Sequence, residues 1–148
     1  MTLLSLTLTA AVLAAPAAPQ APAEAKAPTL YSRLGGYDAI AAVVDDFIGQ
    51  LLSDADLGRF FTGHGQDSRL RIRQLIVDQL CAATGGPCVY IGRDMKASHQ
   101  GLGITEAQWT KSVGYLVKSL DKFKVGQTEK DELLAALTAL KADIVEAP

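Results

Sequence analysis

Histidine and cysteine are the side chains of this sequence with the greatest capacity for chemistry, and the chain has two of each. The sequence contains no nucleophile elbow, no phosphate-binding glycine loop and no paired His-Glu zinc motif. Cys81 and Cys88 are too far apart for the cysteine pair that attaches a c-type haem, and no histidine follows either of them. The candidates therefore narrow to His64 and His99.

His99 lies in the segment GRDMKASHQGLGIT, with Met95 on the same helical face and two glycines just after it. Side chains that could line an apolar cavity around it are Phe61, Tyr90, Ile104 and Trp109. One neutral imidazole nitrogen beside apolar walls is what a b-type haem requires. The other ring nitrogen needs an acceptor, which we expect to be a carbonyl of the same helix. The alternative is a purely structural histidine.

The elements that must position these residues are all helical, because no segment from Thr29 onward alternates as a strand would. The predicted helices cover 29–34, 38–52, 68–83, 93–100, one from Thr105, and one from near Thr128 that continues to Ile144. Thr105 and Gln108 have the spacing of a capping box. The last helix is expected to bury Leu133, Leu134, Leu137, Leu140 and Ile144. The sequence therefore predicts an all-α domain.

The first 28 residues differ in composition from the rest. Residues 1–14 hold most of an apolar run too short to span a bilayer, which resembles a signal peptide although no Lys or Arg stands near Met1. A disordered leader is the alternative. Residues 15–28 are rich in Ala and Pro and are predicted to form a semi-extended linker before a domain over 29–148. The leader predicts export, to the periplasm for example; the alternative location is the cytoplasm.

The overall composition excludes several classes of partner. With 49% hydrophobic and 20% charged residues, the chain is typical of a globular domain. A formal net charge of -2 lacks the basic excess of a nucleic-acid-binding protein, and 6% aromatic residues argue against a stacking platform for single strands. We expect a monomer with no nucleic acid and no membrane span.

Several short motifs follow one another in a distinctive order. They are Leu30-Tyr31-x-Arg33-Leu34-Gly35-Gly36, Val43-Val44-Asp45-Asp46-Phe47, Phe60-Phe61, Gly85-Gly86-Pro87, Tyr90-x-Gly92-Arg93-x-Met95-Lys96 and His99-x-Gly101-x-Gly103-Ile104-Thr105. From Leu30 onward the chain resembles the group 1 (N-type) truncated haemoglobins. The resemblance implies the truncated globin fold, a two-over-two helical sandwich around a non-covalently bound haem b.

The resemblance also implies roles for individual residues. His99 would be the proximal ligand of the iron, and Phe61 would pack on the haem face. The positions that match haem contacts are Tyr90, Met95, Ile104 and Trp109. Arg93 and Lys96 would bind the propionates, or else form an ordinary solvated face.

The distal side departs from the family pattern. Family members commonly have a tyrosine after Asp-Asp-Phe, whose hydroxyl stabilises bound dioxygen, whereas this chain has Ile48. The stretch between Phe61 and Gly85 is also longer than expected, which leaves two alignments of the distal helix. Counted from Gly85, the haem-facing residues are Ile72, Leu75, Ile76 and Gln79; counted from Phe61, they are Leu70 and Gln74. The broader apolar arc favours the first alignment. We therefore expect an apolar distal pocket with Gln79 as its polar group, and a surface role for His64.

These residues favour reversible binding of O₂, NO or CO over catalysis, with NO dioxygenation as a side activity where an electron donor reduces the iron. A haem peroxidase or nitrite reductase is the first alternative, but the distal side offers no clear histidine or carboxylate for acid–base chemistry. A haem-free helical interaction or sensor module is the second.

Cys81 and Cys88 allow two interpretations. They could form a disulfide across the Gly85-Gly86-Pro87 turn in an oxidising compartment. They could also be two half-buried thiols, which is the default we adopt because the sequence does not provide the separation of their Cα atoms.

Overall fold

The computed structural model describes residues 27–147. The leader predicted over 1–14 and most of the linker predicted over 15–28 lie outside the described residues. The helices are α1 (Leu30–Arg33), α2 (Gly36–Ser53), the 3₁₀ turn η1 (Gly58–Phe61), α3 (Gln66–Ala83), α4 (Met95–His99), α5 (Glu106–Lys122), α6 (Gln127–Thr138) and α7 (Lys141–Ile144). Within 27–147 the one β pairing is an isolated bridge between Thr105 and Ala147, so the all-α prediction is confirmed.

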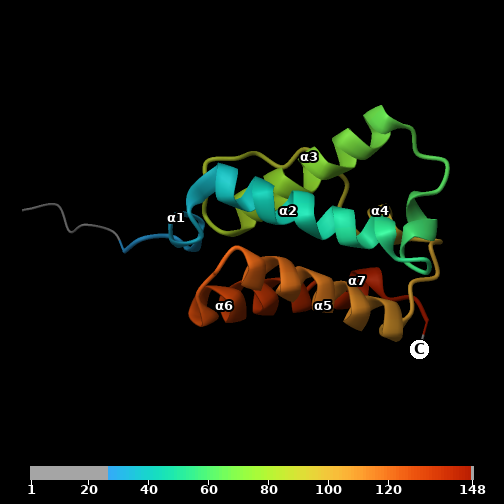
Figure 1. Ribbon diagram of the computed structural model, residues 1–148. Helices are drawn as coiled ribbons and strands as arrows, with labels where there is room; N and C mark the ends of the chain where they lie inside the picture. The colour runs from blue at the N-terminus through green and yellow to red at the C-terminus, as the bar shows by residue number, and fades with distance from the viewer. Residues whose placement is uncertain (1–26, 148) are drawn as a thin grey trace, which may run out of the picture.

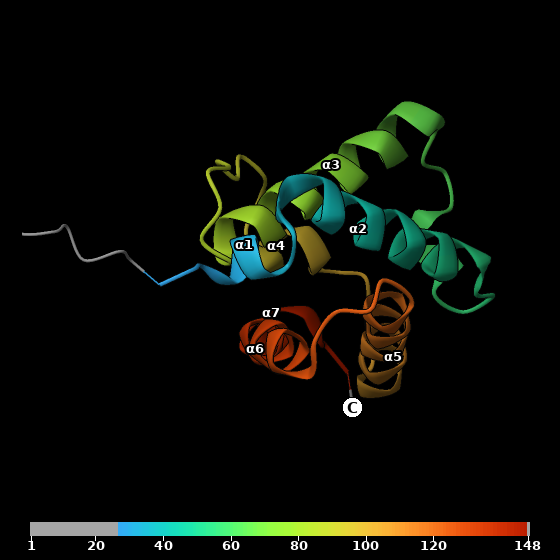
Figure 2. The same cartoon turned by 60° about the vertical axis from the view of Figure 1, so that its left-hand side comes forward.

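The helices form two layers. Figure 1 shows α2 and α3 above α5, α6 and α7. α2 packs against α3 in its own layer and against α5 in the other. The layers remain distinct in the turned view, where α4 lies behind α2 at the level between them (Figure 2). Within residues 27–147, no helix is both long enough and apolar enough to span a bilayer.

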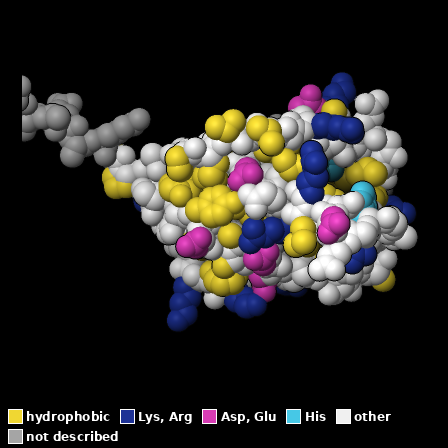
Figure 3. Space-filling model, turned by 90° about the horizontal axis from the view of Figure 1, so that it is seen from above, with side chains coloured by type: hydrophobic (Ala, Val, Ile, Leu, Met, Phe, Trp, Pro, Cys, Tyr) yellow, Lys and Arg dark blue, Asp and Glu magenta, His cyan; other side chains and the backbone are white. Residues whose placement is uncertain are grey.

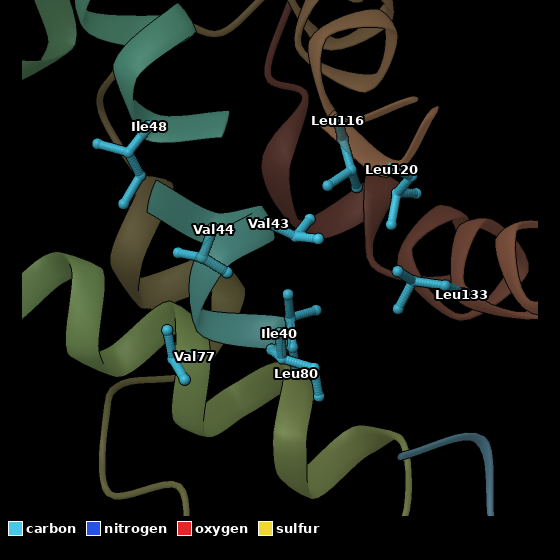
Figure 4. Packing of buried hydrophobic residues seen from close by; sticks show 9 residues of the cluster. All are labelled: Ile40, Val43, Val44, Ile48, Val77, Leu80, Leu116, Leu120 and Leu133. Atoms are coloured by element: carbon cyan, nitrogen blue, oxygen red, sulfur yellow. The ribbon is translucent and has the colours of Figure 1, made fainter. Parts of the chain in front are cut away.

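The core lies where α2 meets α3 on one side and α5 and α6 on the other. Val44 and Val77 have no exposed surface, and Leu120 is 1% exposed. Figure 4 shows the buried cluster, which consists of Ile40, Val43, Val44, Ile48, Val77, Leu80, Leu116, Leu120 and Leu133. The members on α2 recur at three- and four-residue spacing, so this helix buries one face, as its sequence predicts.

The last predicted helix is two helices in the structure. α6 ends at Thr138 and α7 begins at Lys141. At the break, the Leu140 N–H donates to the Leu137 carbonyl at 2.9 Å, three residues back, as in a tightened final turn. α6 packs on α1 and supplies Leu133 to the core, while α7 packs on α4. The prediction of one continuous helix was wrong because its two halves pack on different partners.

Cys81 and Cys88 form a disulfide with their Cα atoms 5.7 Å apart, within the usual range. The default of two free thiols was therefore wrong. The bond joins the end of α3 to the loop that leads to α4. Gly86 is required in this turn, because a Cβ there would lie 2.5 Å from Tyr31 Cδ2 and 2.7 Å from Cys81 Sγ.

Candidate functional site

His99 is the last residue of α4, a helix of five residues. Asp94 caps the helix by accepting a hydrogen bond from the Ala97 N–H at 2.7 Å. His99 Nδ1 lies 2.8 Å from the Met95 carbonyl. Because a carbonyl only accepts hydrogen bonds, Nδ1 carries the proton and the lone pair is on Nε2. Nε2 is therefore the ring nitrogen with a lone pair available to a metal, and the acceptor of Nδ1 lies on the same helix, as expected.

The turn after His99 is held by a residue from the other end of the domain. Gly101 and Gly103 have φ angles of +84° and +65°, in the left-handed region that favours glycine. Their N–H groups donate to the two carboxylate oxygens of Glu146, at 2.7 and 2.6 Å. These backbone hydrogen bonds hold the pKa of Glu146 below its usual range.

The apolar residues assigned to the haem face share one property, which is partial burial. The half-buried set is Phe61, Tyr90, Met95, Ile104 and Trp109. In the loop before α4, Val89 and Ile91 are 76% and 80% exposed. A flat apolar partner that covered these large apolar side chains would be bound favourably, because it would remove their surface from water.

The loop that carries Tyr90 is tied to the start of α4. The Tyr90 hydroxyl donates to the Arg93 carbonyl at 2.6 Å. A Cβ at Gly92 would lie 2.3 Å from that hydroxyl oxygen, so only glycine fits under the ring. The Arg93 and Lys96 side chains are exposed, as either role proposed for them requires.

Trp109 is placed by the start of α5. Both bonds of the predicted capping box are present: Gln108 N donates to Thr105 Oγ1 at 3.2 Å, and Thr105 N donates to Gln108 Oε1 at 3.1 Å. Gln108 is buried and its amide donates to Asp56 at 2.7 Å. The first turn of α5 is therefore fixed at both the backbone and the side-chain level.

Ile48 lies at the other end of the site, on α2. It is 9% exposed and belongs to the core, yet its surface also lines a hollow of about 550 Å³ between α2 and the first half of α3. The hollow is lined by Asp45, Ile48, His64, Gln66, Arg69, Leu70 and Arg73. Figure 3 shows a hollow on this face, bordered by histidine and by Lys or Arg side chains. His64 is exposed and borders the same space as Ile48.

One ion pair spans the wall of this hollow. Arg73 on α3 donates to both oxygens of Asp45 on α2, at 2.7 and 2.8 Å. The hydrogen bond from Arg73 holds the pKa of Asp45 below its usual range. The pair joins α2 to α3 beside the hollow.

The two alignments of the distal helix place their residues differently. Val77 and Leu80 face α2 in the core, and the half-buried Ile76 packs against the same cluster. Ile72, Leu75 and Gln79 are half-buried elsewhere on α3. In the second alignment, Leu70 is 57% exposed at the hollow. Gln74 is exposed, and its amide donates to the Tyr37 hydroxyl at 2.6 Å and to Asp78 at 2.9 Å. That side chain is thus already occupied on the surface of the α2–α3 pair.

Glu146 and the Arg73–Asp45 pair are the residues of this region that sequence reasoning missed. A glutamate beyond the last helix has no local pattern that links it to a glycine turn more than forty residues earlier. Arg73 and Asp45 stand at helical positions typical of a solvated face. The only signal in the sequence is the spacing of Arg73 and Asp45 from the buried residues of their own helices, which could have suggested that the two side chains lie close together.

Residues 29–146 match the family model described as bacterial-like globin. The group 1 truncated haemoglobin of Mycolicibacterium paratuberculosis is 36% identical over 121 residues, which cover 82% of this chain and 87% of that protein. A group 1 truncated haemoglobin of Chlamydomonas moewusii is 27% identical over 139 residues, 93% of this chain and 80% of that protein.

Solved structures agree with this relationship. The 2/2 haemoglobin of Synechococcus, crystallised with covalently attached haem, has a TM-score of 0.72 at 28% identity, covering 80% of this chain and 98% of that one. Truncated haemoglobin of Tetrahymena pyriformis has the same fold, with a TM-score of 0.72 at 24% identity and the same coverage. The two-over-two arrangement of helices is thus confirmed. The chain belongs to the group 1 truncated haemoglobins, within the bacterial-like globins, a family of haem-binding, oxygen-handling proteins.

Proposed function

We propose that this protein holds a haem b through His99 and reversibly binds O₂, NO and CO. The observation that carries the proposal is the hydrogen bond from His99 Nδ1 to the Met95 carbonyl, at 2.8 Å. This hydrogen bond fixes the tautomer in which Nε2 is free to bind a metal. Histidines that bind metals usually donate the N–H of the other ring nitrogen to an acceptor in this way. The haem, when bound, supplies an iron with one open position for a gas.

The residues around His99 fit such a group. Phe61, Tyr90, Met95 and Trp109 are only half-buried, so a macrocycle between α3 and α4 would remove apolar surface from water. Arg93 and Lys96 are exposed near the start of α4 and are the candidate partners of the propionates. We infer non-covalent attachment because both cysteines are in the disulfide and neither offers a thiol.

The distal residues determine how firmly the gas is held. We infer the first alignment of α3, with Ile72, Leu75 and Ile76 toward the haem, because Gln74 of the second is bonded to Tyr37 and Asp78. The Ile48 side chain has no hydrogen-bond donor. The bound gas therefore lacks a hydrogen bond that a tyrosine hydroxyl would provide, worth about 1 kcal/mol. Gln79, half-buried on α3, is then the candidate donor.

NO detoxification is part of the same proposal. With haem held by His99, the site would supply the chemistry for oxidation of NO by dioxygen, and an electron donor would be required to keep the group reduced. The hollow bordered by Ile48, His64 and Leu70 is open to solvent and gives small molecules access to this side of the protein.

Export is supported by one structural observation. The Cys81–Cys88 disulfide is of a kind that persists in oxidising compartments and is rare in the cytosol of mesophiles. Together with the apolar segment near Met1, it favours the periplasm or the cell exterior.

Visible spectroscopy tests the proposal. The protein, reconstituted with haem and reduced with dithionite, should give a Soret band at one haem per chain that shifts when CO is added. His99→Gly should lose the spectrum of histidine-ligated haem and regain it when imidazole is added, while His64→Ala should keep that spectrum. A wild type that takes up no haem would overturn the proposal. If His64→Ala lost this spectrum and His99→Gly kept it, His64 would be the ligand.

A further inference from the structure

Glu146 makes an unusual pair of contacts for a residue beyond the last helix. One carboxylate oxygen accepts from Gly101 N–H at 2.7 Å and the other from Gly103 N–H at 2.6 Å. Both are charge-assisted hydrogen bonds, which are stronger than neutral ones. The two left-handed glycines turn their N–H groups toward one point and form a concave anion site that this carboxylate fills.

This turn continues directly from the helix that carries His99. The Gln100 N–H donates to the Lys96 carbonyl at 2.8 Å, and the Leu102 N–H donates to the His99 carbonyl at 3.1 Å. A displacement of the turn would therefore move the backbone of His99.

The segment that holds Glu146 is itself anchored. The N–H groups of Glu146 and Ala147 donate to the Ile104 carbonyl at 2.9 and 3.3 Å, and Glu106 N–H donates to the Ala147 carbonyl at 3.2 Å. The segment before it, α7, packs against α4. The carboxylate thus connects α4 to a fixed segment.

We infer that Glu146 is a positioning residue for His99, because its carboxylate fixes the Gly101–Gly103 turn and so the distance and orientation at which Nε2 meets the iron. This inference rests on the proposed role of His99. α4 has only five residues and cannot hold its own geometry, so the clamp supplies what a longer proximal helix would provide.

The test compares Glu146→Ala and Glu146→Gln with the matched control Asp143→Asn, which removes an exposed carboxylate on α7. Two properties of the full-length, haem-loaded protein are measured: the iron–histidine stretching band of the ferrous form by resonance Raman, and the rate of haem transfer to excess apomyoglobin. Glu146→Ala should shift or broaden the band and speed haem loss about tenfold or more. Glu146→Gln, which keeps one acceptor oxygen, should fall between it and wild type, and Asp143→Asn should match wild type.

The outcomes separate this inference from the function on which it rests. If wild type shows no iron–histidine band, or His99→Gly retains it, the assignment of His99 fails and the inference with it. If wild type shows the band and Glu146→Ala leaves band and haem loss unchanged, the inference alone is overturned. A lower melting temperature with an unchanged band would also overturn it, because Glu146 would then be only structural. Should Glu146→Ala fail to fold, Glu146→Gln against Asp143→Asn decides by the same measurements.

Discussion

α2 and α3 are joined by buried aliphatic side chains, whereas α4 and the turn after it are held by polar contacts. Val44 and Val77 meet with no exposed surface in the first region. In the second, none of the residues of α4 is buried. α7 packs against this helix, and the polar contacts that hold it are the Asp94 cap, the Met95 carbonyl and the Glu146 carboxylate. The α2–α3 pair, the proposed distal wall, is thus part of the core, whereas His99, the proposed iron ligand, is held by directional hydrogen bonds that set its orientation.

Because of this difference, we expect the two regions to control different properties: the stability of the domain and the binding of haem. Substitutions in the α2–α3 pair should act on unfolding of the whole domain, because they remove buried area. Substitutions around His99 should act on haem geometry with little cost to the fold of the haem-free chain. Three measurements test that distinction.

The largest effect is expected for the same substitution made once in each region. Leu80→Ala removes a side chain that is 8% exposed between α2 and α3, and should lower the free energy of unfolding by about 2–5 kcal/mol. Leu102→Ala removes one that is 40% exposed in the turn after His99, and should change it by less than about 0.5 kcal/mol. Urea denaturation of the haem-free protein measures both. Equal losses would show that the proximal turn is as much a part of the core as α3.

The disulfide should have the next largest effect. Replacing Cys81 and Cys88 together by alanine releases the loop between them and should lower the free energy of unfolding by about 2 kcal/mol. Thermal or urea unfolding in the presence and absence of dithiothreitol checks this. The reductant should lower the stability of wild type to that of the double variant and leave the double variant unchanged. Wild type that is insensitive to the reductant would contradict the prediction.

The smallest effect is expected at the distal wall itself. Ile48→Tyr introduces a hydroxyl beside the ligand position and should slow dissociation of dioxygen about fivefold, the equivalent of one hydrogen bond of about 1 kcal/mol. Stopped-flow replacement of O₂ by CO measures the rate, and Ile48→Phe provides the control of similar bulk without the hydroxyl. An equal rate in both variants would remove Ile48 from the distal pocket.

Much of the fold could be predicted from the sequence because its causes are local. The buried face of α2 follows from the spacing of Ile40, Val43 and Val44, and the capping box follows from Thr105 and Gln108. The Nδ1 acceptor of His99 is four residues away on the same helix. In each case a few neighbouring residues contain the physical cause.

Two of the three features that escaped prediction depend on segments far apart in the chain. The break between Thr138 and Lys141 arises because α7 packs on α4, a contact that helical periodicity does not encode. The disulfide required the separation of two Cα atoms across a turn. The role of Glu146 required knowing that the segment after α7 returns to the glycine turn. Packing between distant segments decides the helix break and the role of Glu146, whereas the geometry of a turn decides the disulfide.

The Glu146 clamp has a consequence for the order in which the domain folds. Its carboxylate is separated along the chain from Gly101 and Gly103 by 45 and 43 residues, whereas the Asp45–Arg73 pair of the distal wall spans 28. Contacts between distant residues form more slowly, and a helix as short as α4 does not persist before its partner arrives. We therefore expect the proposed distal wall to assemble first and His99 to take up its orientation late. If His99 is the iron ligand, haem that reaches the chain early would contact the apolar surface of α2 and α3 before His99 is in position.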